Sequence, residues 1–152
     1  MAVTSITVDA PPSSVFAILA NPQRYETFVV GNSNIRRFDP RWPEEGSEFQ
    51  HTLGFKPLVV MGKTVSLSTD HSTHLAMDTG MGVLGATITV FKLFPTEEGT
   101  RVDLKEEPIR GTVAWFWNKP VDMVLDWRNR WLLKRLKNIA EEQFARQRAT
   151  LP

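Results

Sequence analysis

The sequence contains no cysteine and no long hydrophobic run. Without cysteine, disulfides, thiolate nucleophiles and cysteine-bound metals are excluded. No apolar stretch approaches the roughly 20 residues that a helix needs to span a bilayer, and residues 1–9 lack the charged start and apolar core of a signal peptide. We therefore expect a soluble, cytoplasmic protein without stable membrane insertion.

An excess of charge of one sign is also missing. With 18 basic and 17 acidic residues, the net charge of +1 provides no general attraction for nucleic acid or an acidic membrane. Basic residues do gather near Trp127 and Trp131, namely Arg128, Arg130, Lys134, Arg135 and Lys137. Such a cluster would suit anionic lipid or RNA, but it also suits the C-terminal half of a solvated helix, which is the interpretation we favour. No nucleic-acid partner is expected.

The chain does have enough apolar sequence for a core. It has 152 residues, 41% of them hydrophobic and 23% charged, which predicts a single domain over residues 1–152. Its longest element is a helix predicted over residues 119–148, with Pro120 in the first turn. Helical periodicity places the following residues in one apolar sector, the last two at its edge: Val121, Leu125, Leu132, Leu136, Ile139, Val124 and Trp131.

Upstream of this helix, the pattern is mainly one of strands. Alternation of polar and apolar residues predicts strands near residues 3–9, 34–39, 47–55, 63–70, 75–77, 86–94 and 100–109. Two short helices follow the first strand, and residues 56–62 are predicted to form an apolar loop. Consecutive strands without intervening helices should pair antiparallel, so the pattern predicts an α+β fold. A curved sheet crossed by the last helix leaves room for an apolar cavity between them.

Three short motifs resemble ligand-binding signatures, but the sequence around each argues against that interpretation. Gly80–Gly85 matches the GxGxxG string of dinucleotide-binding folds, but a β-branched segment follows it where a helix is required, so we predict a hairpin loop. Gly62-Lys63-Thr64 resembles the end of a P-loop, yet Pro57 occupies the position of the required glycine. The spacing of His71 and His74 across a turn does not aim both rings at one ion. No metal and no cofactor are expected.

Three polar residues interrupt apolar rows. Strand and helix phase direct His51, Glu106 and Arg128 toward the same interior. They are the candidate catalytic residues, although each could equally be a core-edge side chain held by a local hydrogen bond. A buried Glu106 would need a counter-charge, and Arg128 is the candidate to supply it.

The same periodicity of the strands and the last helix predicts which residues line the cavity. The candidate ligand-binding residues are Phe49, His51, Leu53, Phe55, Val65, Leu67, Met77, Ile88, Leu104, Glu106, Trp115, Trp117, Arg128 and Trp131. Val65 and Leu67 are taken to mark the inward face of their strand. Trp115 and Trp117 would flank the mouth together with the loop at residues 56–62.

Several stretches together carry a family resemblance. They are Ile6–Leu19 followed by Asn21-Pro22, Gly46–Phe49, Glu98–Val102 and the final helix. Nearly the whole chain thereby resembles the SRPBCC (START-like) superfamily, in particular its polyketide cyclase/dehydrase-like branch. The resemblance implies a helix-grip fold, in which about six or seven antiparallel strands wrap round the C-terminal helix and enclose a hydrophobic cavity. The superfamily has no universal catalytic motif, so no catalytic residue is transferred from it.

Three functions follow as hypotheses. The leading one is binding of a small hydrophobic or amphipathic molecule, such as a lipid, polyketide or isoprenoid-like compound, in the cavity. The second is a cofactor-independent cyclase/dehydratase, in which His51 moves a proton, Arg128 stabilises an enolate and Glu106 acts as acid. The third is a protein-interaction module that uses the basic, tryptophan-bearing face of the last helix.

Overall fold

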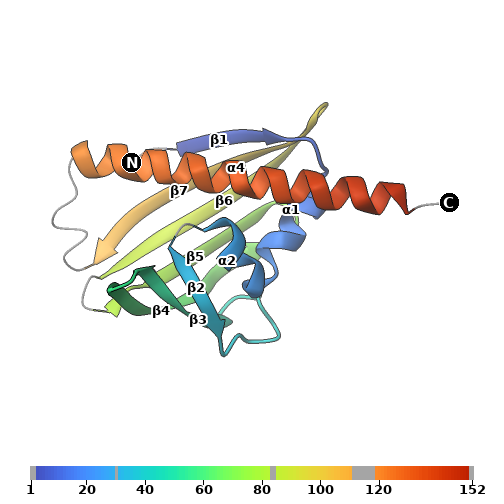
Figure 1. Cartoon of the computed structure of the whole chain (residues 1–152). Helices are drawn as coiled ribbons and strands as arrows, with labels where there is room; N and C mark the ends of the chain where they lie inside the picture. Colours follow the sequence, from blue (N-terminus) through green and yellow to red (C-terminus); the bar gives the residue numbers. More distant parts are fainter. Residues whose placement is uncertain (1–2, 30, 83–84, 111–118, 151–152) are drawn as a thin grey trace.

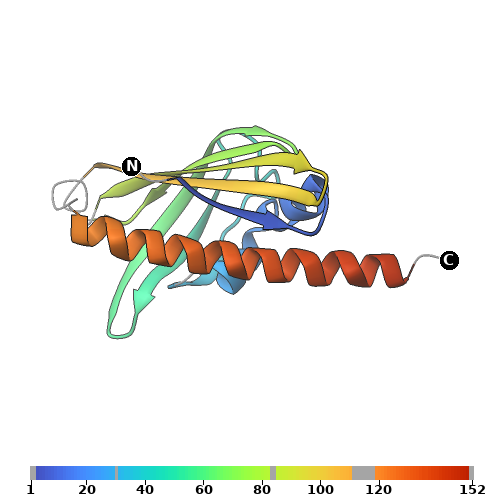
Figure 2. The ribbon, with the colours of Figure 1, turned by 90° about the horizontal axis from the view of Figure 1, so that it is seen from above.

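The computed structural model describes residues 3–29, 31–82, 85–110 and 119–150. Seven strands form one antiparallel sheet in the order β1-β7-β6-β5-β4-β3-β2, and the long helix α4 (Lys119–Ala149) packs across it (Figure 1). The strands are β1 (Val3–Val8), β2 (Asn32–Arg36), β3 (Glu48–Phe55), β4 (Leu58–Asp70), β5 (His74–Gly80), β6 (Ala86–Thr96) and β7 (Gly99–Arg110). Figure 2 shows the sheet arching over α4, with β1 beside the helix. The predicted helix-grip α+β fold is confirmed.

Two short helical segments connect the edge strands β1 and β2. Helix α1 (Pro12–Leu19) begins with proline at its first position, where the missing N–H costs nothing. The predicted second helix is a 3₁₀ turn (Pro22–Arg24) that continues into α2 (Tyr25–Phe28). Their apolar side chains join the core between the sheet and α4. Among the described residues, no helix is long and apolar enough to cross a membrane.

The face of β4 that points inward is opposite to the face predicted from its apolar residues. Phe49 pairs with Thr64 in the β3–β4 register, so these two side chains point to the same side of the sheet. Thr64 is 3% exposed, whereas Leu67 is 38% exposed. The expectation that Val65 and Leu67 face inward is therefore wrong, because hydroxyl side chains occupy the inner row. The loop predicted over residues 56–62 is also too long, since β4 begins at Leu58.

The buried face of α4 is turned slightly from the predicted one. Its fully or nearly fully buried residues are Asn129, Leu132, Leu133, Leu136 and Ala140. Val124 and Trp131, predicted at the edge of the apolar sector, are 62% and 44% exposed. Asn129 and Ala140 belong to the contact face, whereas Val124 and Trp131 lie outside it.

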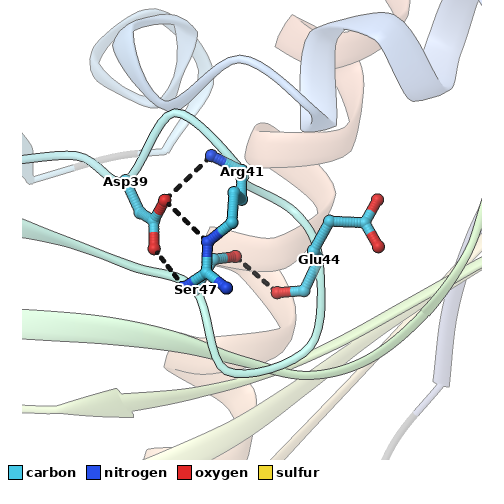
Figure 3. Close-up of polar contacts among 4 residues, drawn as sticks. All are labelled: Asp39, Arg41, Glu44 and Ser47. Atoms are coloured by element: carbon cyan, nitrogen blue, oxygen red, sulfur yellow. Dashed lines mark hydrogen bonds and ion pairs between the residues drawn. The ribbon is translucent and has the colours of Figure 1, made fainter.

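The connection from β2 to β3 is a loop held by its own polar side chains (Figure 3). The Asp39 carboxylate accepts hydrogen bonds from the backbone N–H of Arg41 and from its guanidinium, each at 2.9 Å, and the Ser47 hydroxyl donates to the carbonyl of Glu44. The hydrogen bond from the Arg41 side chain holds the pKa of Asp39 below its usual value. Trp42 in this loop is buried and donates its indole N–H to a carbonyl of α1 at 3.0 Å. The loop thus anchors one end of the core.

Candidate functional site

A cavity of about 270 Å³ lies between the concave face of the sheet and the N-terminal half of α4. It is slightly smaller than the usual range of ligand sites, about 300–1,000 Å³. Half of its lining is apolar or aromatic, namely Tyr25, Val29, Leu53, Met77, Met81, Phe91, Leu104, Leu125 and Leu132. The other half is polar, namely Asn32, His51, Thr64, Thr79, Thr87, Thr89, Glu106, Arg128 and Asn129. The wall therefore combines an apolar surface with a concentrated set of hydrogen-bonding groups.

A row of hydroxyl groups crosses the middle of the sheet. Thr64, Thr79 and Thr87 are direct neighbours in the register of β4, β5 and β6. The hydroxyls of Thr64 and Thr79 are 3.1 Å apart, and Thr64 also lies 2.8 Å from Nε2 of His51. Threonine has the β-branched shape that suits a strand, and it adds a hydrogen-bonding group that valine lacks. The row thus preserves the sheet while making its inner surface polar.

His51 is completely buried at the start of this row. Burial, aided by the nearby charge of Arg36, lowers the pKa of His51 to about 4, so the imidazole is neutral at pH 7. Its Nδ1 has no hydrogen-bond partner among the described residues. Gly62 lies opposite His51 in the register, and an added Cβ there would come within 2.8 Å of the imidazole Cε1. The backbone of β4 is therefore closely fitted to this ring.

Glu106 and Arg128 connect the sheet to α4 at the cavity wall. Glu106 lies on β7 opposite Thr89 of β6, and its Oε2 is 3.5 Å from Nη1 of Arg128. The two side chains are 12% and 26% exposed, so the ion pair is largely shielded from water. A charge that is shielded from water needs an opposite charge nearby, and the sequence pattern predicted that Arg128 supplies it for Glu106. The structure thus brings His51, Glu106 and Arg128 to one cavity.

The structure places the predicted wall residues in different surroundings. Those that line the cavity are His51, Leu53, Met77, Leu104, Glu106 and Arg128. Phe49 lies on the same face of β3 but packs edge-on against Trp42 in the core, with ring centroids 4.8 Å apart. Trp115, Trp117 and the side chain of Phe55 lie outside the described residues. Ligand binding by any of these residues stays a prediction.

Four predicted wall positions do not face the cavity. Val65 and Leu67 lie on the outer face of β4, as described above. Ile88 is also on the outer face, because its neighbours Thr87 and Thr89 point inward. Trp131 is turned to the surface and stacks on Trp127 at a centroid distance of 6.2 Å. On β4 and β6 the cause is that polar side chains face inward, whereas on α4 the buried face is turned away from Trp131.

The sequence prediction missed six polar lining residues. They are Asn32, Thr64, Thr79, Thr87, Thr89 and Asn129. Asn32 precedes the strand predicted near residues 34–39, whereas in the structure it opens β2 and is 8% exposed. A signal existed for Asn129, which is 5% exposed and falls one turn before the apolar residues Leu132 and Leu133. A buried asparagine at that phase indicates a polar contact on the inner side of the helix.

The remaining histidines belong to the surface. His71 lies 2.9 Å from Oε1 of Glu44, and Nε2 of His74 lies 2.9 Å from the hydroxyl of Ser68. The two rings therefore have separate partners. In the described part of the chain, no group of three or more His, Cys, Asp or Glu side chains is arranged to hold a metal.

The same architecture occurs in solved structures of low sequence identity. A Chromobacterium violaceum protein, CV1439, is 16% identical with a TM-score of 0.68, covering 92% of this chain and 96% of its own. The protein Ara h 8.0201 is 12% identical with a TM-score of 0.71, covering 91% and 95%. The Staphylococcus aureus protein SA2116, described as a protein of unknown function, is 12% identical with a TM-score of 0.71, covering 93% of each chain. No family model and no curated protein matches the sequence.

These likenesses, together with the strand order, define the class of fold. The chain has the helix-grip fold, so the fold that the sequence resemblance implied is confirmed. Similar folds carry different functions, so the activity has to be argued from the cavity itself.

Proposed function

We propose that the protein binds a small, largely apolar ligand in the cavity between its sheet and α4. The cavity itself carries the proposal, because protein interiors are packed to leave few voids larger than a water molecule. A space of about 270 Å³ with nine apolar or aromatic lining residues is the kind of site that small molecules occupy. Its size favours a compact ligand over a long-chain lipid.

The first test asks whether the purified protein already carries a ligand. Native mass spectrometry, followed by organic extraction, would detect and identify a stoichiometric passenger without any assumption about its identity. We expect a small apolar molecule. If the mass spectrum shows the protein without a ligand, binding is tested with an added probe.

The second test uses naphthalene as the probe and methionine methyl groups as reporters. Met77 and Met81 line the cavity, whereas Met61 and Met123 are 64% and 74% exposed. In protein labelled with ¹³C-methyl methionine, naphthalene should shift the resonances of the first pair and leave the second pair unchanged. Shifts confined to the exposed pair, or no saturable shift at all, would contradict the proposal.

A matched pair of variants locates the binding. Thr87→Leu places a larger side chain in the cavity, and Ile88→Leu changes the next residue on the outer face of β6. We expect Thr87→Leu to weaken naphthalene binding about tenfold and Ile88→Leu to leave it unchanged. Thermal unfolding of both variants would verify that each is folded.

A second candidate function is supported by the state of His51. The unpartnered Nδ1 of this neutral imidazole lies at the cavity, where a cyclase acting on a poly-ketone chain would need a proton acceptor, although its pKa of about 4 makes it a weak base. Arg128 would stabilise the resulting enolate, while Glu106 is the weaker assignment because its carboxyl group already faces Arg128, with Oε2 3.5 Å from Nη1. On a poly-ketone substrate, His51→Ala should lower the rate about a hundredfold. An unchanged rate would exclude this mechanism.

A further inference from the structure

We infer that the ligand is an uncharged molecule whose apolar body carries hydroxyl groups. The inference rests on the proposed function and adds the chemical class of the ligand. Its basis is the set of hydrogen-bonding atoms that the protein leaves unused at the cavity.

Buried polar atoms without a partner are rare in folded proteins. Among the described residues there are four on side chains: Oδ1 of Asn32, Nδ1 of His51, Oε2 of Glu106 and Oδ1 of Asn129. All four residues line the cavity. Glu106 Oε2 has partial compensation, since Arg128 Nη1 lies 3.5 Å away at ion-pair distance. The unused atoms are thus concentrated at one place in the molecule.

The chemistry of these atoms defines what they would bind. Amide and carboxylate oxygens only accept hydrogen bonds. Nδ1 of His51 is also an acceptor when Nε2–H donates to the Thr64 hydroxyl, which lies 2.8 Å away. A ligand that complements this set has to bring hydrogen-bond donors.

The acceptors lie on both walls of the cavity. Asn32 and His51 project from the neighbouring strands β2 and β3, where Asn32 pairs with Leu53, two residues beyond His51. Asn129 projects from α4 on the other side of the cavity. One hydroxyl can donate to one acceptor, so a ligand with two hydroxyls could donate to an acceptor on each wall.

The charges at the cavity favour hydroxyl donors over an ammonium group. Glu106 is the only carboxylate among the described lining residues, and it already faces Arg128. A bound ammonium would therefore share the only carboxylate of the described lining with an arginine, and it would lose part of its hydration on entering the cavity. A hydroxyl donates equally well and carries no charge to desolvate.

Water molecules can satisfy these acceptors before a ligand binds, since the cavity carries polar groups and is wide enough to hold water. A ligand that displaces them has to reproduce their hydrogen bonds, or affinity is lost. This requirement gives a direct preference for a hydroxylated ligand over an otherwise similar one without a donor.

The test compares 2-naphthol with 2-methoxynaphthalene, which share the naphthalene ring system but differ in the donor. Binding of each is followed by the methyl resonances of Met77 and Met81. We expect 2-naphthol to bind at least tenfold more tightly. Asn129→Leu should reduce this preference several-fold, while Asn138→Leu, at an exposed position of the same helix, should not change it. Asn32→Leu provides an independent second variant on the opposite wall.

The outcomes separate this inference from the proposed function. Equal affinities would overturn the inference and leave the cavity-binding proposal standing. Tighter binding of 2-methoxynaphthalene would also overturn it, because the cavity would then present donors. Absence of binding for naphthalene and both derivatives would overturn the two proposals together.

Discussion

The fit between Gly62 and His51 can be tested by adding a single methyl group. A Cβ at position 62 would lie 2.8 Å from Cε1 of His51 and 3.0 Å from the backbone oxygen of Gly80. Gly62→Ala should therefore displace the imidazole and lower the free energy of unfolding by about 1–3 kcal/mol. Gly80→Ala is the control, because its nearest contact would be an ordinary 3.7 Å. Equal stability of the two variants in denaturant unfolding would contradict the close fit.

The depressed pKa of His51 makes stability depend on pH. Above pH 6.5 the imidazole is neutral in both folded and unfolded chains, but below it the unfolded chain binds a proton that the folded chain excludes until about pH 4. Stability is therefore lost as the pH falls through this window. We expect His51 to account for a loss of about 2 kcal/mol between pH 7 and pH 5.

Two glutamine variants isolate this contribution. His51→Gln should flatten the pH dependence of the unfolding free energy between pH 7 and pH 5. His71→Gln is the surface control, because the side chain of His71 is 61% exposed. If His51→Gln and the unmodified protein lose stability in parallel, the histidine is protonated without penalty in the folded state.

At the scale of single elements, α4 presents two different faces. Its inner face is buried, while Trp127 and Trp131 stack on its outer face and the guanidinium of Arg135 lies 5.6 Å from the Trp131 ring. Trp127 is 64% exposed, in contrast to Trp42, which is 6% exposed. We expect Trp127→Ala to lower the unfolding free energy by less than about 1 kcal/mol and Trp42→Ala to lower it by about 3–5 kcal/mol. Comparable losses in denaturant unfolding would mean that the outer tryptophan is also part of the core.

Strand β4 illustrates where prediction from pattern fails. In β3, alternating Phe49 and His51 gave the correct inner face, because an apolar residue marks it. In β4 the inner row holds Thr64 and Ser66, and the neighbouring apolar side chains lie outside. The rule that apolar residues face inward assumes a packed core, and it breaks down along the wall of a partly polar cavity. The reversal in β4 is thus itself a sign of the site.

For the whole molecule, the architecture was predictable because its signals are local. Short connections between alternating strands require antiparallel pairing, and the long amphipathic helix needs a face on which to pack. The cavity is different, since it depends on side chains from distant segments. Asn32 and Asn129 meet there from β2 and α4, and neither segment alone indicates the other. Glu106 and Arg128 were predictable because a charge in an apolar row implies a counter-charge.

This ion pair joins the helix to the sheet, so its strength can be measured by a double-mutant cycle. Glu106→Gln and Arg128→Met should each lower the unfolding free energy by about 1–3 kcal/mol, because each removes the charge that the other side chain faces. The double variant should lose less than the sum, which gives a coupling of about 1 kcal/mol. Arg146 and Glu142, whose side chains are 77% and 63% exposed, form the control pair, with an expected coupling below about 0.5 kcal/mol. Equal couplings for the two pairs would mean that water screens the cavity pair as fully as the surface pair, and that the polar wall is open to solvent.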